Sequence, residues 1–140
     1  MAIVNSLRRI ISGFGAGAGP GAGPGGYATA AAVALSGATA QTTPVTMGGQ
    51  GYTNGMIRVK VYNGGGANTT VALTISATDG TNTYIIATVP ATAVANAANS
   101  GLDMLFEVNV DILIATVNLI STLAGTTTTA TMDYEVDLNP

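Results

Sequence analysis

The chain has 140 residues, enough for one domain built around one core. Only 8% of its residues are charged, against about 25% in an ordinary soluble domain, so its surface is not the usual mixed-charge shell. The absence of Cys and His excludes disulfides, thiolate zinc sites, haem ligation through His and catalytic triads that need imidazole. A net charge of −3 with four Lys and Arg residues argues against a nucleic-acid footprint.

The N-terminal segment differs from the rest of the chain. Apolar residues at i, i+4, i+7 and i+8 spacing predict a short amphipathic helical segment, with Arg8 and Arg9 inside it; these residues are Ile3, Leu7, Ile10 and Ile11. Residues 13–26 are almost entirely Gly, Ala and Pro, which predicts a flexible tether. We therefore expect an N-terminal arm over residues 1–26 and a folded domain over 27–140.

Neither a targeting signal nor a membrane span is expected. The two arginines interrupt the first apolar stretch, whereas a secretory signal places basic residues before an unbroken apolar run. The apolar stretch 112–124 contains polar residues and is shorter than the roughly 20 residues that a spanning helix needs. We expect a chain synthesised in the cytoplasm that has no membrane partner.

From about residue 28 the hydrophobic period becomes two, as in half-buried strands. The clearest case is 102–114, where every even position is apolar. Asn54-Gly55, Asn63-Gly64 and Asp79-Gly80 are typical turn dipeptides, and Pro90 is expected to end a strand. An antiparallel, jelly-roll-like β-sandwich of about eight strands follows; the expected strands are 30–38, 42–47, 56–62, 70–78, 83–89, 102–110, 112–123 and 127–138.

No motif in the sequence predicts a cofactor-binding site or a catalytic site. Residues 21–26 match the G-x-G-x-x-G dinucleotide pattern formally, but that pattern should follow a strand, and here it follows a glycine tract. Acid–base catalysis needs a raised carboxyl pKa and a cleft, and nothing in the sequence indicates a cleft. We expect no enzyme activity, no cofactor and no resident metal.

A row of acidic residues is the most distinctive charged feature. Asp133, Glu135 and Asp137 share one face of the last strand, and Asp103, Glu107 and Asp111 form a looser row on one parity. Three interpretations stay open for the first row. It binds a hard cation such as Ca²⁺, it accepts basic residues of a partner or of the Arg58/Lys60 face, or it is a solvated face that keeps the strand soluble.

The arm is the second candidate contact. Its four apolar side chains suit a protein groove, with Arg8 and Arg9 hydrogen-bonding to carboxylates or carbonyls around it. The alternatives are attraction to anionic lipid, for which two charges supply only about 2 kcal/mol, and a tail without a role.

Taken together, a strand-rich domain with few charges avoids aggregation when its surface is committed to specific neighbours. Ordering Thr or Ala at a contact costs less entropy than ordering Lys. An arm ahead of a compact sandwich adds a second contact, and the tether between them raises avidity. These features are typical of an assembly subunit.

The length, the Gly/Ala/Pro arm at 13–26 and the Thr-rich strands at about 28–138 resemble the small jelly-roll cement, or decoration, proteins of tailed bacteriophages. The resemblance implies a noncovalent staple on the capsid exterior of the virion that binds the major capsid protein. It implies a homodimer, with a trimer as the alternative, and neither nucleic-acid binding nor a reaction. The alternative functions are a tail, fibre or pilus-like filament subunit and a host- or carbohydrate-binding sandwich module.

Overall fold

A computed structural model describes residues 26–47, 51–66, 68–98, 100–126 and 128–140 of the chain. The predictions made for residues 1–25, including the helical segment and most of the tether, lie outside the described residues. The described part of the chain forms eight strands and no helix, so no helix there is long and apolar enough to cross a membrane. The strands are β1 (Tyr27–Ser36), β2 (Gln41–Thr46), β3 (Tyr52–Tyr62), β4 (Thr70–Thr78), β5 (Thr83–Ala93), β6 (Leu102–Ile114), β7 (Thr116–Ala124) and β8 (Thr129–Asn139).

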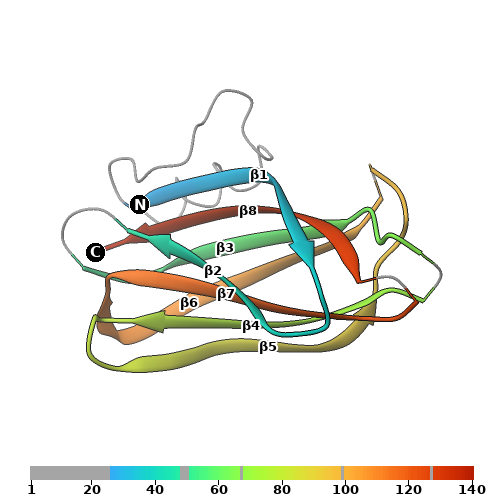
Figure 1. Ribbon diagram of the computed structural model, residues 1–140. Helices are drawn as coiled ribbons and strands as arrows, with labels where there is room; N and C mark the ends of the chain where they lie inside the picture. The colour runs from blue at the N-terminus through green and yellow to red at the C-terminus, as the bar shows by residue number, and fades with distance from the viewer. Residues whose placement is uncertain (1–25, 48–50, 67, 99, 127) are drawn as a thin grey trace.

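The strands form two antiparallel sheets that pack face to face (Figure 1). One sheet has the order β1-β8-β3-β6 and the other the order β2-β7-β4-β5. Successive strands mostly alternate between the two sheets, which is the connectivity of a jelly roll. The expected antiparallel β-sandwich is therefore confirmed.

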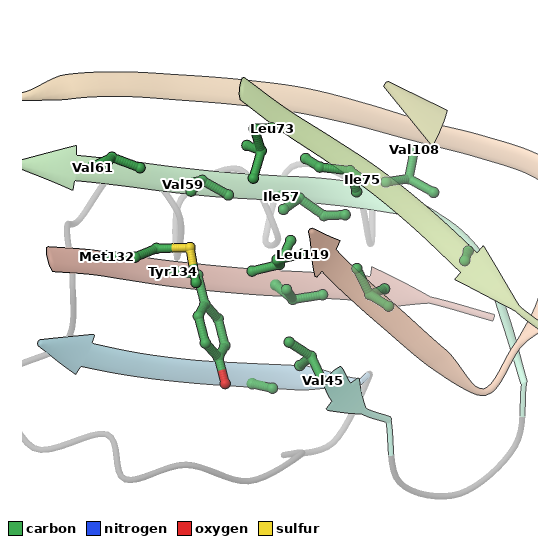
Figure 2. Packing of buried hydrophobic residues seen from close by; sticks show 14 of the residues in the cluster. Val45, Ile57, Val59, Val61, Leu73, Ile75, Val108, Leu119, Met132 and Tyr134 are labelled. Carbon is green, nitrogen blue, oxygen red and sulfur yellow. The ribbon is translucent and has the colours of Figure 1, made fainter. Parts of the chain in front are cut away.

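The core lies between the sheets and is almost entirely aliphatic. Ile57, Val59 and Val61 of β3 face inward from the first sheet, and Leu73 and Ile75 of β4 face them from the second. Figure 2 shows these side chains gathered with those of β7 and β8 between the two layers. The period-two pattern of the sequence places these residues inside, because successive side chains of a strand point to opposite faces.

Three predicted boundaries were wrong for identifiable reasons. Pro90 does not end its strand, because β5 is an edge strand and its proline needs no partner for a missing N–H. Asn54-Gly55 is no turn but lies inside β3, next to an irregularity in the pairing with β6. The break between the predicted strands 102–110 and 112–123 falls at Ala115, since β6 runs unbroken to Ile114.

Asp79-Gly80 does form the turn that joins β4 to β5, as predicted. The Asp79 Oδ1 atom accepts hydrogen bonds from the backbone N–H groups of Thr81 (2.8 Å) and Asn82 (2.7 Å). These bonds favour the ionised form and hold the pKa of Asp79 below its usual value. Gly80 has a φ of 99°, which residues other than glycine rarely adopt.

Two isoleucines on neighbouring strands test which side chains face the core and which face solvent. Ile75 is fully buried, whereas Ile85 is 71% exposed. We expect Ile75→Ala to lower the free energy of unfolding by about 2–5 kcal/mol, through lost burial and the cavity left behind. Ile85→Ala should change it by less than about 0.5 kcal/mol, since the side chain already faces solvent. Urea titration of both variants measures the difference, and equal losses would contradict the inside–outside assignment.

Candidate functional site

The charges are segregated onto one side of the molecule. We call the outer side of the β1-β8-β3-β6 sheet the acidic face; it carries Asp103, Glu107, Asp111, Asp133, Glu135 and Asp137 on β6 and β8. The chain has seven Asp and Glu residues, and only Asp79 lies elsewhere. The two acidic rows predicted from the sequence therefore share one face, and β3 runs between them.

The cations of β3 lie between the two acidic rows. Arg58 is in register with Glu135 on one side and Leu105 on the other, and its guanidinium reaches Asp103, with Nε to Oδ1 at 3.0 Å and Nη2 to Oδ2 at 2.7 Å. This hydrogen bond is the main cause of a raised Arg58 pKa and a lowered Asp103 pKa. Lys60 lies between Asp133 and Asp103 in register. The ion pair of Arg58 thus forms with the second acidic row, whereas toward the first row Arg58 and Lys60 lie in register with Glu135 and Asp133.

Asp133 has a structural role within the sheet. Its Oδ1 atom accepts hydrogen bonds from the backbone N–H of Ala32 (2.7 Å) and from the hydroxyl of Tyr62 (3.0 Å). Ala32 has a φ of 56° and lies where the register of β1 with β8 shifts, so the carboxylate supports a β-bulge. Burial, followed by the bond to Asp133, raises the pKa of Tyr62.

Glu135 and Asp137 are different, because both are 0% exposed although they lie on the outer side of the sheet. The hydroxyl of Tyr27 donates a hydrogen bond to Glu135 Oε1 at 2.9 Å. The interpretation of a solvated acidic face is therefore wrong for these two residues. Among the described residues no group of three or more potential ligands is arranged to hold a metal ion, so the geometry offers no support for the calcium alternative.

The four strands of the opposite sheet contain no charged residue. We call the outer side of the β2-β7-β4-β5 sheet the threonine face; its four strands contain no Asp, Glu, Lys or Arg. Its outward positions include Thr42, Thr46, Thr70, Thr74, Thr78, Thr83, Thr88, Thr116 and Thr122. This face was not predicted from the sequence, although Thr recurs at alternate positions of 70–78 and so marks one side of that strand.

The other predicted contact residues, Ile3, Leu7, Arg8, Arg9, Ile10 and Ile11, lie outside the described residues. Asp133, Glu135 and Asp137 do share one face, as predicted. Leu105 and Leu113 of the edge strand β6 are 50% and 63% exposed on the acidic face.

Comparison with protein-family models, with curated proteins and with solved structures finds no match. The chemistry of the acidic face and of the threonine face is therefore the evidence that bears on function.

The ion pair of Arg58 and Asp103 makes a testable contribution to stability. Because the folded-state pKa of Asp103 is lowered, the contribution is present above the unfolded value of about 3.9 and is lost as the pH falls through the folded value. The side chains of Arg58 and Asp103 are 23% and 42% exposed, so solvent screens the pair in part, and Asp103→Asn should cost about 1 kcal/mol or less at pH 7 and nothing at low pH. Chemical denaturation across this pH range measures it. In an Arg58→Met background the same substitution should have little effect, and an unchanged cost there would contradict the pairing.

Proposed function

We propose that the chain is a structural virion protein that binds the outside of a tailed-phage capsid and bridges neighbouring major capsid subunits without covalent bonds. The observation that carries the proposal is the threonine face, an uncharged sheet surface opposite a strongly acidic one. In this role the threonine face lies on the shell and the acidic face points to solvent. The protein performs no reaction and needs no cofactor.

The chemistry of the threonine face supports a contact role. An uncharged face of short side chains is desolvated without burying a charge, and ordering Thr costs less entropy than ordering Lys or Glu. Four strands about 4.8 Å apart and about 30 Å long give a flat area on the order of 500 Å². This area is somewhat smaller than the roughly 800 Å² that each partner contributes to a standard interface.

The exposed edge strand β5 also supports assembly. Its side chains are mostly exposed, and Ile85, at 71% exposure, is the most exposed large apolar residue of the described chain. An open strand edge with apolar side chains pairs readily with another chain, so we propose self-association into a dimer along this edge. A carbohydrate-binding platform finds less support, because Tyr84 is the single exposed tyrosine and the chain has no Trp.

A charge placed on the threonine face tests the proposal. Thr74→Lys or Thr122→Lys should weaken binding to empty capsid shells of the encoding phage by roughly tenfold or more, because the ammonium group loses water at the contact. Thr81→Lys, at the exposed tip of the β4–β5 turn, is the matched control and should bind as the wild type does. Sedimentation of the purified chain through a gradient with and without shells provides the measurement.

The outcomes separate the function classes. Co-sedimentation that the face variants lose and the control retains supports a capsid role. Polymerisation of the chain alone at high concentration would favour a filament subunit instead, because a filament interface does not close. A chain that stays monomeric and binds no shell would overturn the proposal.

A further inference from the structure

Some side chains of the acidic face are exposed, whereas a group of neighbouring polar side chains on it is buried. Glu135 and Asp137 are 0% exposed, Thr29 is 3% exposed and Asn139 is 9% exposed. These residues are neighbours on the outer side of β1 and β8, since Thr29 pairs with Glu135 in register. All eight described strands belong to the two sheets, so no described strand forms a third layer above them.

A comparison with equivalent positions shows how unusual this burial is. Outward side chains of the other central strands, such as Lys60 on β3 and Thr74 and Thr122 on β4 and β7, are mostly half-buried, and the exception, Ser76, is small and uncharged. A glutamate is larger than a threonine and charged, so it should be at least as exposed on an open face. Tyr27 and Arg58 lie beside Glu135, but two fully buried carboxylates on an outer face point to a further segment that covers β1 and β8.

We propose that this covering segment is the chain's own N-terminal arm, residues 1–25, and that Arg8 and Arg9 dock against Glu135 and Asp137. This inference goes beyond the proposed capsid role and does not depend on it. It is argued from charge, from the place where the arm joins the sheet, and from the shape of the face.

Charge complementarity identifies the occupant. Burying a carboxylate is costly unless a cation and hydrogen bonds accompany it. The chain has four Lys and Arg residues. Arg58 is in register with Glu135 but hydrogen-bonds to Asp103 at two points, so it is shared between these two carboxylates, and Lys60 is in register with Asp133 and Asp103. The remaining cations among the Lys and Arg residues are the adjacent Arg8 and Arg9, whose guanidinium groups suit carboxylates better than Lys does.

The arm joins the sheet at the edge of the buried region. The backbone N–H of Leu138 donates a hydrogen bond to the carbonyl of Gly26 at 3.2 Å, and Tyr27 pairs with Asp137 in register. The stretch from Arg9 to Gly26 spans roughly 55 Å when fully extended, far more than a return to the same strands requires. A short tether gives an effective concentration in the millimolar range, so the chain's own arm outcompetes that of a second copy at micromolar concentration.

The neighbouring surface has the form that arginines and aliphatic side chains need. A pocket of about 190 Å³ opens beside the buried carboxylates and is lined by Asn54, Gly55, Met56, Glu107, Val108 and Asn109. Met56 lies between Asp137 and Glu107 in register, so an apolar floor is flanked by acids on both sides. Arginine stems and the isoleucines at 10 and 11 pack on such a floor while the charged groups reach its rim.

A spin label on the arm of the full-length chain tests the docking. The chain has no Cys, so Ser12→Cys provides a single attachment site. We expect paramagnetic broadening of amide signals in β1, β8 and the adjoining part of β3, with the strands of the threonine face unaffected. Arg8→Glu/Arg9→Glu should reduce the docked population, and hence the broadening, by roughly tenfold or more, because charged hydrogen bonds are lost and repulsion replaces them. Arg8→Lys/Arg9→Lys keeps the charge and should retain most of it.

Each other outcome overturns the proposal. Broadening that is absent or spread evenly over both faces means that the arm does not dock on the acidic face. Broadening that survives Arg8→Glu/Arg9→Glu means that the carboxylates do not hold it. A mixture of labelled unenriched chain and unlabelled ¹⁵N-enriched chain should show no broadening, and broadening there would assign the surface to the arm of a second copy. The double variant Glu135→Gln/Asp137→Asn should also reduce the broadening, because it removes the charges that the arginines bind. If this variant fails to fold, the arm variants still test the docking.

Discussion

A sandwich of two sheets has two outer sides, and each of them needs either charges or a covering partner to stay out of nonspecific association. In this protein the few ionised side chains are concentrated on one of those sides. The acidic face carries nearly all the carboxylates, together with Arg58 and Lys60, whereas no strand of the opposite sheet carries a charge. The uncharged side depends for solubility on neutral polar groups, mostly hydroxyls, and this constraint underlies the proposed role in assembly.

Within the acidic face, three kinds of carboxylate have different surroundings. Asp103 forms a partly exposed ion pair with Arg58, which we expect to contribute about 1 kcal/mol or less to stability. Asp133 accepts hydrogen bonds that support the bulge in β1. Glu135 and Asp137 are fully buried, which in a protein requires a partner that compensates the lost hydration. Carboxylates of one face thus take part in ion pairing, in backbone support and, as we propose, in docking, according to the strand that lies beside each of them.

The fold was largely predictable, because period-two alternation determines which side chains face the core and is visible in the sequence. The strand 70–78 was predicted to the residue, and the inward residues of 102–114 were predicted too. Pro90 was misjudged because its tolerance depends on β5 being an edge strand, which is a property of the sheet order. The burial of Glu135 was beyond prediction for a similar reason. Alternation places a side chain on the outer face but says nothing of what covers that face.

The orientation of the protein on its partner is the most direct test of this account. A cryo-electron microscopy reconstruction of decorated shells, at a resolution that separates the two sheets, shows which sheet touches the capsid. We predict that the β2-β7-β4-β5 sheet lies against the shell and that the β1-β8-β3-β6 sheet lies on the side away from it. A reconstruction with the acidic sheet against the shell would contradict it, and so would shells that carry no added density at saturating protein.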